Sequence, residues 1–227
     1  MKQILKTLSV YYVAYFILLM LMLGMLYAYP KVELHLLLNS CHSNLQDTIF
    51  KYYSMLAEWP LYVLALLPLA WKKKEITIFF ALCELSGGAM VQILKRIFSA
   101  PRPVSVFDNY PDLVLPLVDG VHMHHSNSFP SGHTSTFFIF FTCCAFILAY
   151  HYLRQANRHD LRTQILFNLL LLLLLALAAL GGYSRIYLSQ HFLSDVCVGS
   201  MIGVTIPCLI FHLCKNKVLE LNLNETK

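Results

Sequence analysis

Long apolar runs occupy most of the sequence, and they restrict its fold more than any other feature. A helix that crosses a bilayer needs about 20 mostly apolar residues. No internal repeat and no linker divides the chain, so we expect a single all-α domain at residues 1–227. The runs predict a bundle of six transmembrane helices, at residues 8–29, 54–71, 76–98, 130–150, 165–183 and 192–214.

The first two runs differ from the simple pattern of an apolar transmembrane helix. The first follows Lys2 and Lys6, as the h-region of a signal peptide would. Its apolar core is longer than the usual ~7–15 residues and no A-x-A-like cleavage site follows, which favours a retained helix. The second run is the least regular of the six, because it contains Glu58, Pro60 and Pro68.

The segment between these two runs, residues 30–51, is mixed and polar. Its apolar residues recur at intervals that one face of a helix can carry, which predicts a helix lying in the membrane interface. The predicted stripe consists of Leu34, Leu37, Leu38, Leu45, Ile49 and Phe50.

Composition excludes an ordinary soluble protein. Apolar residues make up 58% of the chain and charged residues 13%, whereas soluble domains average about 45–50% and about 25%. The formal net charge is +5, but the basic residues lie in short clusters between apolar runs rather than over a solvated face. The positive excess therefore concerns membrane topology and not a nucleic-acid partner.

The basic residues also predict the orientation in the bilayer. Six transmembrane helices would place both termini on one side. Cytoplasmic loops carry an excess of Lys and Arg, so the side with the larger number is expected to be cytoplasmic. Eleven lie on the terminal side: Lys2, Lys6, Lys72, Lys73, Lys74, Arg154, Arg158, Arg162, Lys215, Lys217 and Lys227. Six lie on the other side: Lys31, Lys51, Lys95, Arg96, Arg102 and Arg185.

The first cluster with chemical potential follows the third apolar run. Lys95 and Arg102 are seven residues apart. Pro101 and Pro103 end the helix there, so the two cations can converge on one anionic ligand from a helix end and a loop. The simpler interpretation is a pair of basic side chains that extend toward the membrane edge.

The second cluster, Ser128-Phe129-Pro130-Ser131-Gly132-His133, enters the fourth apolar run. Pro130 suits the first position of a helix. Ser131 and Gly132 would then offer free backbone N–H groups to an anion at the helix N-terminus, with His133 in reach. The alternative is an ordinary helix cap beside an interfacial histidine.

The third cluster combines Ser184-Arg185 with His191 and Asp195. His191 and Asp195 are four residues apart, so on a helix they would face each other. A carboxylate on one imidazole nitrogen fixes the tautomer and makes the other nitrogen a stronger base or nucleophile. Arg185 offers a planar fork to phosphate oxygens. The alternative is a structural polar contact that lowers the cost of burying Asp195.

Together the clusters supply three cations, a helix N-terminus and two histidines. This is the set that phosphoryl transfer requires without a metal, because charge on the phosphoryl oxygens is neutralised while a nucleophile is aligned and an acid serves the leaving oxygen. The residues alone leave open whether His133 or His191 is the nucleophile, although the carboxylate at Asp195 favours His191.

Three motifs resemble those of the type 2 phosphatidic acid phosphatase (PAP2) superfamily: Lys95-x6-Arg102-Pro103, Pro130-Ser131-Gly132-His133 and Ser184-Arg185-x5-His191-x3-Asp195. Their order, spacing and all eleven fixed positions agree, over a core at about residues 95–195. The resemblance implies a PAP2-like helical bundle.

The resemblance also implies roles for these residues. His191 would attack phosphorus and form a phosphohistidine, Asp195 would orient it, and His133 would protonate the leaving group. No metal or other cofactor is implied. The implied phosphate ligands are Lys95, Arg102, Ser131, Gly132 and Arg185, and the remaining motif positions Pro103, Pro130 and Ser184 would support them.

The expected function is a metal-independent phosphatase acting on a membrane lipid phosphate, at the periplasmic face of a bacterial inner membrane. Lipid A and undecaprenyl diphosphate are the favoured substrates, with phosphatidylglycerol phosphate and phosphatidic acid as alternatives. A lipid phosphotransferase with the same site, and a binding protein without catalysis, are the other hypotheses. The loop histidines His122, His124 and His125 predict either a metal site or a solvated rim.

Overall fold

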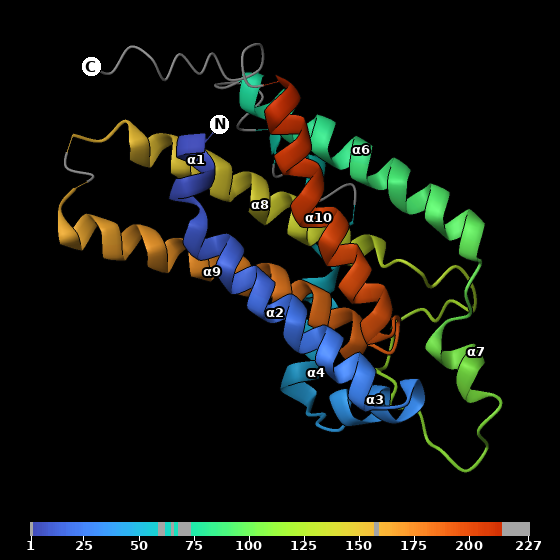
Figure 1. Ribbon diagram of the computed structural model, residues 1–227. Helices are drawn as coiled ribbons and strands as arrows, with labels where there is room; N and C mark the ends of the chain where they lie inside the picture. Colours follow the sequence, from blue (N-terminus) through green and yellow to red (C-terminus); the bar gives the residue numbers. More distant parts are fainter. Residues whose placement is uncertain (1, 59–61, 65, 68–73, 157–158, 215–227) are drawn as a thin grey trace.

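The structure is a computed structural model that describes residues 2–58, 62–64, 66–67, 74–156 and 159–214. The ordered elements in these ranges are helices, drawn in Figure 1. Their bounds are α1 (Lys2–Thr7), α2 (Ser9–Ala28), α3 (Lys31–Leu38), α4 (Asn44–Met55), α6 (Lys74–Phe98), α7 (Pro103–Phe107), α8 (Gly132–Leu153), α9 (Leu161–Tyr187) and α10 (Leu193–Cys214).

The all-α fold is confirmed, as are five of the predicted transmembrane helices. Five helical segments in the described ranges are long and apolar enough to cross a membrane, and they contain α2, α6, α8, α9 and α10. The sixth prediction, residues 54–71, lies partly outside the described part of the chain, at residues 59–61, 65 and 68–71.

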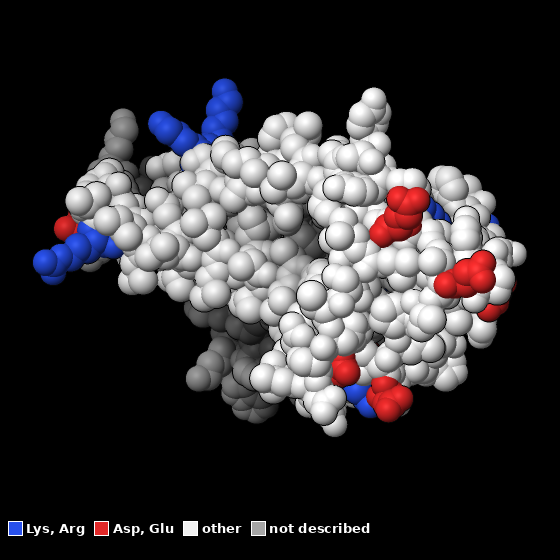
Figure 2. Space-filling model, turned by 90° about the horizontal axis from the view of Figure 1, so that it is seen from below, with Lys and Arg blue, Asp and Glu red and all other residues white. Residues whose placement is uncertain are grey.

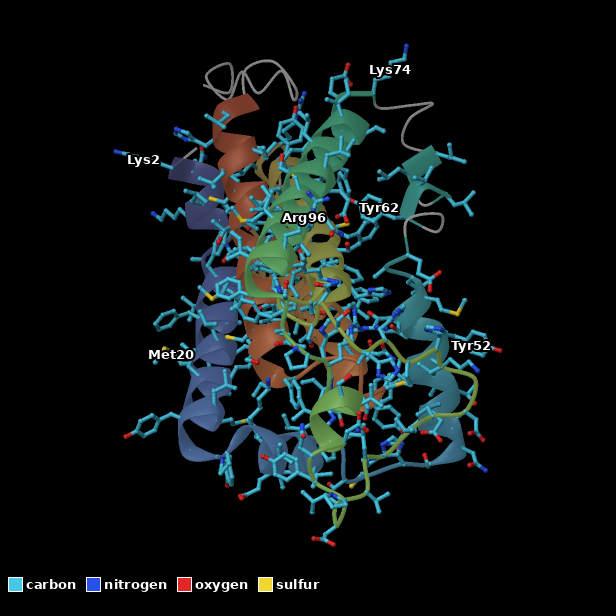
Figure 3. All side chains as sticks on the ribbon, turned by 90° about the vertical axis from the view of Figure 1, so that its right-hand side faces the viewer. Lys2, Met20, Tyr52, Tyr62, Lys74 and Arg96 are labelled. Carbon is cyan, nitrogen blue, oxygen red and sulfur yellow. The ribbon has the colours of Figure 1, made fainter. Side chains whose placement is uncertain are left out.

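The outer surface of the bundle is suited to lipid. Large apolar side chains of α2 and α9 are exposed, among them Phe16, Leu21 and Leu169. Met20 points away from the bundle in Figure 3. On the face shown in Figure 2, Lys and Arg prevail at the end of the α8–α9 turn and Asp and Glu at the opposite end, while the wide middle carries no charge. Exposed apolar surface of this extent is characteristic of a bilayer-embedded protein.

Helix α8 is the centre of the bundle and packs against α6, α9 and α10. Its Phe138, Ile139 and Phe146 are fully buried. Two tyrosines of α2 bond across to this core, Tyr11 Oη to Thr142 Oγ1 at 2.9 Å and Tyr15 Oη to Ser200 Oγ at 3.2 Å. Such interhelical hydrogen bonds and close packing hold helices together where lipid supplies no hydrophobic driving force.

Gly203 allows α10 to lie close against α8. A Cβ at this position would lie 2.3 Å from Phe138 Cβ and 2.8 Å from the Ser135 carbonyl oxygen. We expect Gly203→Ala to lower the free energy of unfolding by about 1–3 kcal/mol, the usual cost of overpacking a core. Thermal unfolding in detergent measures this. Gly88→Ala is the control, because nothing lies within 4 Å of its added Cβ, and an unchanged melting temperature for Gly203→Ala would refute the prediction.

Three short helices gather at one end of the bundle. Figure 1 places α3, α4 and α7 at the end opposite to α1 and to the C-terminal end of α10. Lys2 and Lys74 both lie at that other end in Figure 3, on opposite sides of the molecule, while Tyr52 of α4 lies toward the first end. The helices α3, α4 and α7 therefore lie at the end of the bundle away from α1.

The prediction of one interfacial helix at residues 30–51 is wrong in part. The segment forms two helices, α3 and α4, because Ser43 caps a new helix by accepting a hydrogen bond from the Gln46 N–H. The predicted apolar stripe divides accordingly. Leu34 and Phe50 are buried, whereas Leu37, Leu45 and Ile49 are exposed.

Candidate active site

The structure brings the three sequence clusters together at the end of the bundle that holds α3, α4 and α7. Lys95 lies in the last turn of α6 and Arg185 in the last turn of α9, while Arg102 precedes α7. Lys95 lies near enough to Arg102, Arg185 and Asp195 to interact electrostatically with each. Residues up to a hundred positions apart in sequence thus share one site.

His191 and Asp195 meet, but not on a shared helix as the spacing suggested. His191 lies in the α9–α10 loop, and α10 begins at Leu193 with Asp195 in its first turn. His191 Nδ1 is 3.3 Å from Asp195 Oδ2, and both side chains are buried. The loop bends back over the helix N-terminus, so the pair forms by a cap-like contact rather than across one helical turn.

Asp195 is held by several donors besides His191. Its Oδ2 accepts from Ser128 Oγ at 2.5 Å and from the Phe192 N–H at 3.1 Å, and its Oδ1 accepts from Ser194 Oγ at 3.1 Å. A buried carboxylate with this many donors is kept ionised and fixed in orientation. Ser128 is the first residue of the second sequence cluster, but it was not among the residues predicted to contribute to catalysis or phosphate binding.

The buried position of His191 keeps its imidazole neutral. Burial lowers the pKa of His191 to about 3, against the opposing effect of Asp195. With Nδ1 protonated and facing Asp195, the lone pair is on Nε2. The ring therefore presents an unprotonated nitrogen over the physiological pH range, as a nucleophile must.

The two arginines are fixed by different elements. Arg102 donates from Nη1 to Gln190 Oε1 at 3.0 Å and from Nε to the Ser126 carbonyl at 3.0 Å. Arg185 donates from Nη1 to Ser54 Oγ of α4. Its Nε has no partner among the described residues. Gln190 and Ser54 were not found from the sequence, because nothing in their local pattern distinguishes them.

The start of α8 differs from the prediction in two respects. Ser131 is the N-cap, since its Oγ accepts from the Thr134 N–H, so Pro130 precedes the cap instead of occupying the first helical position. The Ser131 N–H donates to the Asp195 carbonyl at 3.0 Å and is not free. The N–H groups of Gly132 and His133 have no partner in the described part of the chain and remain available to an anion.

Two predicted supporting residues have structural contacts. Ser184 Oγ donates to the Gly181 carbonyl one turn earlier at 2.7 Å and is fully buried. Pro103 begins α7, where a missing N–H costs nothing. These positions shape the backbone around Arg185 and Arg102.

A hydrogen-bonded chain anchors the loop that carries His191. Ser189 adopts a left-handed backbone with φ of 50°. Its Oγ donates to the Pro116 carbonyl at 2.6 Å and accepts from Asn39 Nδ2 at 2.8 Å. His42 continues the chain to Asp47, whose pKa is lowered chiefly by a hydrogen bond from Tyr187. Helices α3 and α4 thereby hold the loop in place.

A cavity of about 270 Å³ opens beside these groups. Arg185 and His133 line it from the bundle, α4 contributes Lys51 and Ser54, and Glu58 follows α4 in the chain. The loop before α8 contributes His122 and His124. Within the described residues, no group of three or more His, Cys, Asp or Glu side chains is arranged to hold a metal ion.

Comparison with known proteins identifies the family of this chain. A profile of the PAP2 superfamily matches residues 76–219, more than half of the chain. The chain belongs to the PAP2 superfamily. Lipid phosphate phosphatase delta of Arabidopsis thaliana is 27% identical over 182 residues, which are 77% of this chain but 40% of the plant protein. This chain thus spans well under half the length of that relative.

Two solved structures share the fold. LpxE from Aquifex aeolicus has a TM-score of 0.58 at 25% identity, over 82% of this chain and 97% of that protein. The transmembrane PAP2-type phosphatidylglycerolphosphate phosphatase from Bacillus subtilis has a TM-score of 0.61 at 15% identity, over 96% of this chain and 98% of that protein. The second likeness concerns the fold alone.

Proposed function

We propose that this protein is a metal-independent phosphatase that hydrolyses a membrane lipid phosphate through a phosphohistidine. The observation that carries the proposal is the geometry of His191: its imidazole is buried, lies 3.3 Å from Asp195, and lies near Arg102 and Arg185, which in turn lie near Lys95. A site built only to bind an anion has no need of an oriented neutral imidazole. The family membership supports the same activity.

The proposed reaction has two steps. His191 Nε2 attacks phosphorus while the bond to the leaving oxygen breaks and His133 gives that oxygen a proton. His133 then accepts a proton from water, whose oxygen attacks the phosphohistidine and releases phosphate and free His191. Lys95, Arg102, Arg185 and the N–H groups at the start of α8 would stabilise the charge that develops on the phosphoryl oxygens.

The proposed location follows from charge and from the shape of the fold. The site lies at the end opposite to α1, which the distribution of basic residues predicts to be extracytoplasmic. We propose the periplasmic face of a bacterial inner membrane, with the substrate tail in the bilayer. Lipid A and undecaprenyl diphosphate are the proposed substrates, ahead of phosphatidylglycerol phosphate and phosphatidic acid.

Phosphate release by the purified protein tests this function. We expect release from at least one of those four lipid phosphates, presented in mixed micelles, with activity unchanged in EDTA. Product analysis with a labelled lipid distinguishes hydrolysis from transfer to another acceptor. Absence of release from every member of the panel, or loss with EDTA and rescue by one metal, would contradict the proposal.

A further inference from the structure

The cavity beside the catalytic residues is lined partly by side chains that the transfer of one phosphoryl group does not use. Lys51 of α4 lines it together with His122 and His124 of the loop before α8. The rings of His122 and His124 lie close together, with centroids 4.8 Å apart. Among the described residues that line the cavity, Glu58 is the only one with a carboxylate.

The Lys51 ammonium group is held by one hydrogen bond and keeps further N–H donors available. Its Nζ donates to the Asp119 carbonyl at 2.9 Å, and no described carboxylate forms an ion pair with it. An ammonium group has three donors, so two remain. Gly120, with φ of 70°, makes room for it, because a Cβ there would lie 2.5 Å from Lys51 Nζ. The turn at residues 119–120 therefore both binds the Lys51 ammonium group and leaves space for it.

His124 lies near two groups of positively charged or imidazole side chains. Partial burial lowers its pKa, and after burial the main contributions come from Arg102, His122 and Arg185. His124 thus lies near the cations of the transfer site as well as beside His122. An anion bound between them would favour protonation of His124 and add a donor.

We propose that Lys51, His122 and His124 form a subsite for a second phosphoryl group, bonded directly to the one that is transferred. The substrate class is then a lipid diphosphate. This inference rests on the proposed function. We infer a direct bond between the two phosphoryl groups because His133 and Arg185 line the same cavity as Lys51.

The subsite has a defined place in the reaction. His191 attacks the terminal phosphorus, and the bond from that phosphorus to the bridging oxygen breaks. The bridging oxygen leaves with the electron pair as part of the lipid monophosphate and takes the proton of His133. Lys51, His122 and His124 stabilise the negative charge of this leaving phosphate. The leaving group of a simple monoester is an alcohol and carries no phosphate.

Lys51→Met tests the subsite, because it removes the charge and keeps most of the unbranched side chain. We expect kcat/KM for a prenyl diphosphate to fall about 10- to 100-fold, the effect of losing a hydrogen bond to a charged group. We expect the value for phosphatidic acid to change less than about twofold, within the range of a surface substitution. Lys51→Arg should restore the diphosphate activity.

Arg96→Met is the matched control, since Arg96 is an exposed cation of α6, labelled in Figure 3, that does not line the cavity. Phosphatidylglycerol phosphate, whose two phosphates are separated by glycerol, distinguishes the directly bonded group from a more distant one. A loss confined to this lipid, an equal loss on diphosphate and monoester, or no loss on the diphosphate would each overturn the inference.

A measurement on the unmodified protein complements the variants. Inorganic pyrophosphate is expected to inhibit at a concentration at least about tenfold lower than inorganic phosphate, because it fills both positions. Equal inhibition by the two anions would overturn the subsite. Absence of activity on every lipid phosphate would instead refute the proposed function, so the two failures are distinguishable.

Discussion

His191→Ala is expected to abolish phosphate release, with kcat reduced at least about 10⁴-fold, because the substitution removes the proposed nucleophile that forms the first bond to phosphorus. The protein should still fold, because the substitution removes only the polar contacts of the His191 ring with Ser128 and Asp195 and leaves a small cavity. Rapid quenching of wild-type protein with ³²P-labelled substrate should give protein-bound label that is stable to base and labile to acid, as phosphohistidine is. His191→Ala should give none.

Two further variants make this result specific. His212→Ala changes an exposed histidine in the last turn of α10 and should leave activity unchanged. His133→Ala should slow turnover by about 10²- to 10⁴-fold, the range for a general acid–base group, yet still accept label at His191. Label that persists in His191→Ala and disappears in His133→Ala would reverse the roles of the two histidines.

The transmembrane helices could be predicted because each lies in one continuous apolar run. The requirement for about 20 apolar residues is a local property of the chain, so the limits of α2 and α6 differ from the predicted ones by a residue or two. Helix α9 is longer than predicted at both ends. At its N-terminus the extension is explained by Asp160, which caps the polar first turn. The break between α3 and α4 depends on the Ser43 cap, which the apolar pattern does not show.

The site could be predicted only as far as its residues lie in the three motifs. Ser128 contacts Asp195 across 67 positions of sequence, and Asn39 contacts Ser189 across 150. These contacts exist because helix packing closes the bundle, and no spacing rule covers such distances. The same holds for Arg185 and Ser54, and for the lysine at position 51 that faces the cavity.

The two errors in the predicted site both concern where a helix begins, and in both a side chain caps the helix. Ser131 caps α8 with its hydroxyl, which shifted the start of that helix beyond Pro130. Asp195 caps α10 through the Phe192 N–H, which left His191 outside the helix. In both places the predicted residues still meet, because a cap brings the preceding residues back over the first turn.

Asp195→Asn is expected to be nearly as damaging as loss of the nucleophile, with kcat reduced about 10³- to 10⁴-fold, as expected when the carboxylate that fixes a catalytic imidazole is replaced by an amide. Ser128 Oγ and the Phe192 N–H both donate to Oδ2. An amide oxygen kept at that position leaves its NH₂ group at the Oδ1 position, where Ser194 Oγ donates. Turning the amide to relieve this places a donor against His191 Nδ1 and moves the ring proton to Nε2.

Either arrangement weakens the nucleophile without removing the phosphate ligands, so KM should change far less than kcat. Ser194→Ala is the matched control, because it removes only a contact to Oδ1 and leaves the Oδ2 geometry on the His191 side intact. We expect it to lower kcat by less than about tenfold, the range for one hydrogen bond. Steady-state kinetics of the two variants decide the matter: an Asp195→Asn enzyme that kept a tenth of wild-type kcat would show that Asp195 serves folding and not the orientation of His191.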